Sequence, residues 1–153
     1  MTPLPGFPAP GEKSARRTLL DHIVAGTAPA PPYIRRLRLP NCDSWGLGWV
    51  TVDFSCSEEF SVARNTIFGG YVAALVDQYA GLVMYTVLPD GVDFLTGDLA
   101  LEFVAPVRPG PVRVEAEATE LTHRHATVEV RVSQGGALCC RGVATQITRK
   151  ATA

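Results

Sequence analysis

The sequence predicts an α+β fold in which an antiparallel β-sheet wraps around one long central helix. Residues 68–88 carry apolar side chains at the three- and four-residue spacing of a helical face, and Asp77 is their only charged residue. Beyond residues 89–91, four runs of alternating apolar and polar residues follow, joined by short links. Short links favour antiparallel neighbours, and the apolar face of such a sheet needs the cover that the long helix can supply.

The four alternating runs each place apolar side chains on one face. In the first run, the apolar residues point away from Asp98 and Glu102; they are Leu99, Leu101 and Phe103. The next two runs repeat this pattern, with Val112, Val114, Ala116 and Ala118 in one and Val128, Val130 and Val132 in the other. A turn over 133–136 leads into a last run over 137–147. We therefore expect four consecutive strands that pair side by side.

Composition indicates a soluble globular domain. The 153 residues are 46% hydrophobic and 19% charged, with a formal charge of −1, which is enough chain to bury a core. The arginines are scattered, so the basic stripe of a nucleic-acid-binding protein is missing. The charge at the middle of the long helix argues against a membrane span. The N-terminal residues do not resemble a signal peptide, so we expect a cytoplasmic location.

We expect two parts along the chain: a proline-rich arm with a short helix over residues 1–32, and a single domain over residues 33–150. Eight of the twelve prolines fall in the first forty residues. Residues 1–11 are therefore expected to be extended or disordered, and residues 28–32 to form a stiff connector. Between them, residues 14–25 are expected to form a helix with Ser14 as its N-cap.

Two strands and a loop are expected before the long helix. From Tyr33 the side chains alternate untidily, which favours a strand. Residues 45–54 alternate more clearly, with Val50 and Val52 on one face, and the polar residues 55–65 are expected to form a loop.

The long helix contains a carboxylate where a buried helix rarely has one. Gly69 and Gly70 begin it, with the N–H groups of the first turn left free, and Pro89 ends it. A helix that is apolar on all faces is expected to lie enclosed, and an unpartnered ionised carboxylate inside a protein costs several kcal/mol. Asp77 is therefore a candidate functional residue. The alternative is that it points to solvent from a half-exposed helix or bonds a backbone group of a neighbouring strand.

Other kinds of catalytic site are not expected. The four cysteines have neither a metal-site nor a disulfide-framework spacing, and we expect free, mostly buried thiols at Cys42, Cys56, Cys139 and Cys140. His123 and His125 share a strand face, but no third ligand with suitable spacing accompanies them, so no metal is expected. No nucleophile elbow or phosphate-binding glycine loop is present, and no cofactor is expected.

Three stretches carry a resemblance to a known family. They are Phe68-Gly-Gly-Tyr-Val-Ala-Ala-Leu-Val-Asp77, Thr96-Gly-Asp-Leu-Ala-Leu-Glu-Phe103 and Pro106-Val-Arg-Pro-Gly110. Together they resemble the hotdog-fold acyl-CoA thioesterases, in particular the branch named after the phenylacetate-pathway thioesterase. The resemblance covers residues 33–148.

The resemblance implies an acyl-CoA substrate and a homodimer, often paired into a dimer of dimers, with sites between subunits. Asp77 matches the carboxylate that attacks the thioester or activates water. Gly69 matches the oxyanion donor at the helix N-terminus, and Thr96 matches the hydroxyl residue that positions the water or the carboxylate. We expect Phe68 and Gly70, which flank Gly69, to contact the substrate.

Helix geometry supports the dimer independently. Gly69 and Asp77 are eight residues apart, which is roughly 12 Å along a straight helix. A reacting carbonyl must lie about 3 Å from both the acid and the oxyanion donor. If both residues act on one thioester, they therefore come from two helices, as a two-fold dimer would allow.

The sequence departs from the family pattern at two positions. The branch usually has His at the position of Phe68, and Asn or Gln at the position of Val62; Asn65 is a candidate substitute for the latter. Arg124 and Arg64 are candidates for contact with the phosphates of coenzyme A, with a solvated surface arginine as the alternative for each. The predicted function is acyl-CoA thioester hydrolysis, and the alternative is an acyl-CoA-binding protein of the same fold without catalysis.

Overall fold

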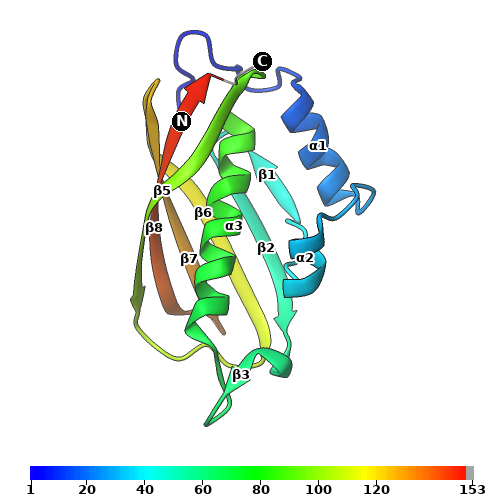
Figure 1. The fold of residues 1–153 in the computed structure, drawn as a ribbon, viewed down its shortest axis with the longest axis vertical. Helices are drawn as coiled ribbons and strands as arrows, with labels where there is room; N and C mark the ends of the chain where they lie inside the picture. Colours follow the sequence, from blue (N-terminus) through cyan, green and yellow to red (C-terminus); the bar gives the residue numbers. More distant parts are fainter. Residues whose placement is uncertain (151–153) are drawn as a thin grey trace.

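A computed structural model describes residues 1–150 and confirms the α+β architecture. The long helix α3 (Gly69–Val87) lies against one face of a six-stranded antiparallel sheet (Figure 1). The sheet order is β1-β2-β6-β7-β8-β5. The consecutive strands β6, β7 and β8 pair side by side as predicted, whereas β5 lies at the edge of the sheet and pairs with β8 instead of β6. The strands are β1 (Ser44–Gly46), β2 (Trp49–Cys56), β5 (Val92–Phe103), β6 (Gly110–Leu121), β7 (His125–Gln134) and β8 (Ala137–Lys150).

Two helices precede the sheet. The predicted first helix is present as α1 (Ala15–Val24), and the Ser14 hydroxyl accepts a hydrogen bond from the Arg17 N–H at 3.2 Å. The strand predicted from Tyr33 is wrong, because this segment forms a second helix, α2 (Pro32–Leu37). Proline at the first helical position fixes φ near the helical value, and a helix of six residues is too short for its period to be read from the sequence.

The N-terminal arm, residues 1–11, contains turns but no helix or strand, in keeping with the expected extended segment, and it is hydrogen-bonded to the core rather than disordered. Arg17 is 3% exposed, and its guanidinium donates to the carbonyl oxygens of Pro8, Ala9 and Glu12 in the arm. The same guanidinium donates to Thr86 O, near the end of α3, at 2.7 Å. One buried cation therefore joins the arm, α1 and the long helix.

The segments predicted as one strand and one loop are more structured than expected. Residues 44–56 form the hairpin of β1 and β2, with Val50 and Val52 buried as predicted. Residues 55–65 contain the end of β2, a 3₁₀ helix (Glu58–Phe60) and β3 (Ser61–Val62), which pairs with β4 (Thr66–Ile67). Strands of two residues are too short to show an alternating pattern.

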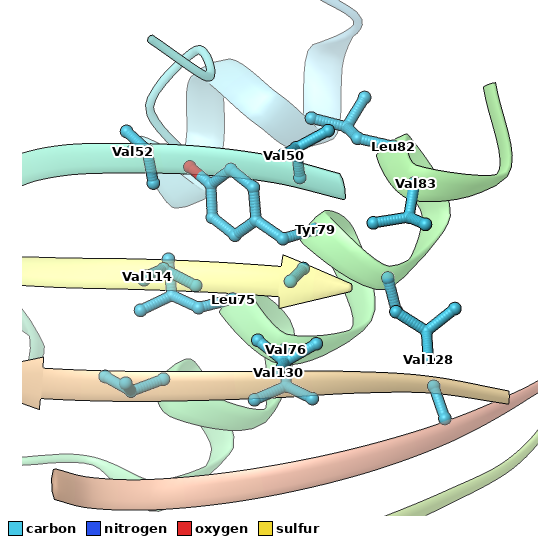
Figure 2. Packing of buried hydrophobic residues seen from close by; sticks show 14 of the residues in the cluster. Val50, Val52, Leu75, Val76, Tyr79, Leu82, Val83, Val114, Val128 and Val130 are labelled. Atoms are coloured by element: carbon cyan, nitrogen blue, oxygen red, sulfur yellow. The ribbon is translucent and has the colours of Figure 1, made fainter. Parts of the chain in front are cut away.

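The core lies between α3 and the sheet. Figure 2 shows Leu75, Val76 and Tyr79 of α3 packed against Val114 of β6 and Val130 of β7, all of which are buried. The predicted inward faces of β6 and β7 are confirmed, because their alternating valines and alanines are buried. Apolar burial on this face is the main force that holds the helix on the sheet.

The long helix is covered by the sheet on one side and only partly by α1 and α2 elsewhere, so the expectation that it lies fully enclosed is wrong for the single chain. Its buried face includes Leu75, Val76 and Val83, whereas its other face is half-buried or exposed. That face carries small residues beside its polar ones: Gly70, Ala73, Ala74, Asp77, Gln78 and Gly81. Small side chains would let a second backbone approach closely.

The helix sits close to β8 because Gly142 has no side chain. Gly142 is buried in the middle of β8, where it pairs with Leu101 of β5 and Val130 of β7. A methyl group at this position would overlap the side chain of Val76 on α3. The spacing between helix and strand therefore depends on this glycine, and with it the position of the residue after Val76, which is Asp77.

The cysteines are free and buried, as predicted. Burial raises the pKa of the Cys42 thiol to about 11, and burial also raises the pKa of Cys56 and Cys140. No helix among residues 1–150 is long and apolar enough to span a membrane.

We predict that Gly142→Ala lowers the free energy of unfolding by about 1–3 kcal/mol, because the added methyl group overpacks the contact with Val76. Urea denaturation measures this change. Val76→Ala provides the matched partner: in the double variant the space vacated by Val76 accepts the new methyl group, so the combined loss is smaller than the sum. Strictly additive losses would show that the two residues do not meet.

Candidate active site

Asp77 projects from the open face of α3 and is held by a strand residue. Its side chain is exposed in the single chain, so the expectation of a buried carboxylate is wrong, but the carboxylate has a defined partner. The Thr96 hydroxyl, on β5, donates a hydrogen bond to Asp77 Oδ1 at 2.7 Å. Two residues that are nineteen positions apart in the sequence are thereby brought together.

A β-bulge in β5 turns Thr96 toward the helix. Thr96 pairs with Gln146 of β8, and Asp98 pairs with Thr145, which leaves Gly97 as the additional residue. Before the bulge, Phe94 packs against the core, and Thr96, on the same side of the strand, faces Asp77 of α3; after the bulge, the odd-numbered Leu99 packs against the core. Without the bulge, Thr96 would share the outward face of Asp98, because strand side chains alternate.

The third member of this group, Gln146, was not anticipated from the sequence. Its side chain on β8 is fully buried, and its Nε2 donates to Thr96 Oγ1 at 3.2 Å. Thr96 has one hydroxyl hydrogen, which it gives to Asp77, so it can accept from Gln146 at the same time. The sequence does hold a signal for Gln146: it is a polar residue in the same alternation as Cys140 and Ala144, which lie on the apolar face of β8.

Asp77 and Thr96 line a cleft of about 240 Å³. Two polar groups, Gln78 and the Tyr33 hydroxyl, lie beside them; the other walls are formed by Gly81, Leu82, Tyr85 and Phe94. The cleft therefore offers one carboxylate among mainly apolar and aromatic side chains, as small-molecule sites often do.

The first turn of α3 presents free N–H groups. The Tyr71 and Val72 N–H groups both donate to Phe68 O, whereas no hydrogen bond within residues 1–150 uses the N–H of Gly69 or Gly70. The positive end of the helix dipole adds to their attraction for an anion. The Phe68 ring, which is 57% exposed, lies over Gly70, where a Cβ atom would overlap it unless the ring moved.

Exposed apolar side chains surround this helix N-terminus. Phe103 and Val104 at the end of β5 are 54% and 57% exposed, and Val62 on β3 is 52% exposed. Together with Phe68 they place several exposed apolar side chains beside Gly69.

Three further candidates lie away from Asp77 within the chain. Arg64 and Asn65 form the turn between β3 and β4, both in the left-handed conformation with φ of 63° and 53°. Figure 1 places β3 beyond the N-terminal end of α3. Arg124 is exposed in the turn between β6 and β7, at the other end of the sheet. The single chain thus brings Asp77 and Thr96 together, but neither arginine reaches them.

The chain matches the model of the thioesterase superfamily over residues 64–140, which is half of its length, and it belongs to that family. Hydrolysis of a thioester is the activity that this membership supports. A protein from Saccharolobus solfataricus, named as an unconfirmed esterase, is 26% identical over 106 residues, covering 69% of this chain and 70% of its own length.

Solved structures confirm the hotdog fold. A phenylacetic acid degradation-related protein from Ralstonia eutropha superposes with a TM-score of 0.75 at 23% identity, covering 84% of this chain and 98% of its own. A thioesterase from Haemophilus influenzae gives 0.70 at 18% identity, covering 77% and 82%. A hypothetical thioesterase from Streptococcus pneumoniae, solved with coenzyme A, gives 0.66 at 18% identity, covering 73% and 87%. At these identities the likeness concerns the fold alone.

We predict that Thr96→Val lowers kcat for thioester hydrolysis by roughly tenfold to a hundredfold, because Asp77 loses the hydrogen bond that orients it. Gln146→Met should lower kcat by roughly tenfold with little change in KM, since it acts through Thr96 rather than on substrate. Thr96→Ser keeps the hydroxyl and should retain most of the rate. Steady-state kinetics on the four proteins measure these effects; equal rates for Thr96→Val and Thr96→Ser would contradict the assignment.

Proposed function

We propose that this protein is an acyl-CoA thioesterase in which Asp77 serves as nucleophile or general base. The observation that carries the proposal is the hydrogen bond of 2.7 Å from Thr96, which orients the Asp77 carboxylate in an open cleft. A positioned carboxylate needs no metal or cofactor to activate water or to attack a thioester carbonyl.

We further propose that the active unit is a homodimer in which Asp77 of one chain works with Gly69 of the other. Gly69 and Asp77 lie on one continuous helix, roughly 12 Å apart along its axis, so one carbonyl cannot contact both in the same chain. The open, small-residue face of α3 and the exposed apolar side chains beside Gly69 supply surfaces that a second copy would cover. A dimer of dimers is compatible with this arrangement.

The proposed reaction follows from these positions. In the general-base route, water attacks the thioester carbonyl carbon while the Asp77 carboxylate accepts its proton. The carbonyl oxygen becomes an oxyanion that the N–H groups of Gly69 and Gly70 stabilise. Collapse of this intermediate breaks the C–S bond, and the departing thiolate receives the proton from Asp77. In the nucleophilic route, an Asp77 oxygen attacks the carbonyl carbon, and the C–S bond breaks to release the thiolate and leave an anhydride; water then hydrolyses the anhydride, which regenerates the Asp77 carboxylate and releases the proton that the thiolate takes up.

Coenzyme A is the proposed carrier of the acyl group. The S. pneumoniae structure of the same fold, solved with coenzyme A, supports this choice. We propose Arg124 and Arg64 as phosphate contacts, because both are exposed and guanidinium binds phosphate bidentately. Phe68 is proposed to contact the acyl thioester from the helix N-terminus, and Asn65 to act as a polar positioning group from the neighbouring turn of the partner chain.

We predict that Asp77→Asn lowers kcat/KM for acyl-CoA hydrolysis at least a hundredfold, because the amide cannot accept the proton or attack efficiently. Asn is nearly isosteric and can still accept the hydrogen bond from Thr96, so the fold should be retained. Thiol release from short, medium, long and aryl acyl-CoA thioesters measures the rates.

Glu117→Gln provides a matched control, since it makes the same change from carboxylate to amide at an exposed position of β6 that does not line the Asp77 cleft; its loss should be much smaller. If the wild type cleaves no thioester but binds acyl-CoA, the protein is a non-catalytic binding protein and the proposal is wrong. Full activity in Asp77→Asn would equally contradict it.

A further inference from the structure

A second cleft lies between the N-terminal segment and α3. It has a volume of about 120 Å³ and is lined by α1, the proline-rich connector, α2 and the C-terminal half of α3. Its apolar walls include Leu19 and Ile23 from α1, Ile34 from α2, and Leu82 and Tyr85 from α3. One water needs about 10–15 Å³ of such space, so the cleft has room for a chain of several methylene groups.

This cleft is adjacent to the one that contains Asp77. The two share Tyr33, Gln78, Leu82 and Tyr85 in their linings. At their junction the Tyr33 hydroxyl donates a hydrogen bond to Gln78 Oε1 at 3.0 Å. The second cleft therefore begins directly beside the one that contains Asp77, and an acyl chain that reaches from one to the other passes this hydrogen-bonded pair.

The first wall of the cleft, α1, is held in place by specific contacts. Besides the buried Arg17, the neighbouring Arg16 donates to Pro89 O at 2.8 Å and pairs with Asp93 at 3.1 Å. The first turn of α1 is also capped from outside, because the Asp90 carboxylate accepts from the Ala15 N–H at 2.9 Å. These bonds fix α1 to the end of the long helix, so its separation from α3 is built into the structure.

The opposite wall includes the segment that follows α2, and two tyrosines of α3 hold this segment in place. The Tyr79 hydroxyl donates to Pro40 O at 2.7 Å, and the Tyr71 hydroxyl donates to Arg38 O at 3.3 Å. Burial raises the pKa of both phenols, in the case of Tyr71 to about 12, so both remain protonated donors at neutral pH. The cleft therefore stays open between two anchored walls.

The chemistry of the lining identifies the part of a substrate that it would accept. Its lining residues, all within the described chain, include no Asp, Glu, Lys or Arg. The phosphates of coenzyme A would find no charged partner there, whereas an apolar chain would leave water for a largely hydrocarbon surface.

We propose that this cleft binds the acyl chain of the substrate and selects for acyl groups of medium length, with the N-terminal segment acting as the specificity element. The inference rests on the proposed function, which identifies coenzyme A as the carrier of the acyl group. It assigns residues 19–34, which lie outside the matched family segment, a role in substrate choice.

The test uses S-alkyl-CoA thioethers with ethyl, butyl, hexyl and octyl chains, which lack the carbonyl group and cannot be hydrolysed. Isothermal titration of the full-length wild type should show the affinity rising by about threefold to fourfold for each added methylene until the cleft is full. Binding is measured without turnover, so the result does not depend on whether the protein is an enzyme.

Two variants change the cleft in opposite directions. Ala28→Trp places a large side chain in the lining, so octyl affinity should fall at least tenfold while ethyl affinity stays unchanged. Ile34→Ala enlarges the cleft, so affinity should continue to rise with chain length beyond the length at which it levels off in the wild type. Val24→Trp, at a position of α1 that is 41% exposed and outside the lining, is the matched control and should bind like the wild type.

Circular dichroism melting confirms that each variant is folded. The proposal is wrong if wild-type affinity does not rise with chain length, or if the folded Ala28→Trp and Ile34→Ala variants both keep the wild-type profile. If the profile shifts as expected but no acyl-CoA is cleaved, the cleft binds acyl chains and only the proposed catalytic function fails.

Discussion

The hydrogen bond between Thr96 and Asp77 is the interaction on which the candidate site depends. It joins the middle of the long helix to an edge strand, and it exists because two backbone features place its partners. Gly142 lets the helix sit close to β8, and the bulge at Gly97 turns Thr96 toward that helix. The buried Gln146 side chain donates a hydrogen bond to the Thr96 hydroxyl, so a residue of the core helps to set the orientation of the exposed Asp77 carboxylate.

Under the proposed mechanism, the single chain is complete in its core but supplies only part of each active site. The sheet buries one side of α3, while the side with Asp77 and the small residues remains open. The free N–H groups of the first turn lie at the end of the same helix, too distant from Asp77 to share a carbonyl. A second copy would cover the open side and bring the missing group, which explains why both features occur together under the proposed mechanism.

The sequence predicted those features that depend on local patterns. The limits of α3, the valine faces of β6 and β7 and the candidate acid Asp77 all follow from spacing along one segment. The helix α2 was missed because six residues show too little periodicity, and the contacts of Arg17 with the arm were missed because they depend on tertiary placement. Gln146 was missed because its role depends on the register between β5 and β8, which a bulge shifts.

The most direct test of the shared site is complementation between two inactive chains. Asp77→Asn removes the acid; Gly69→Pro removes the N–H at the first helical position, where proline is tolerated. If each site combines Asp77 of one chain with Gly69 of the other, the two chains refolded together in equal amounts should recover about one quarter of wild-type activity, because half of the dimers are mixed and each has one intact site of two. If both residues of a site come from the same chain, the mixture stays inactive, and the account is contradicted.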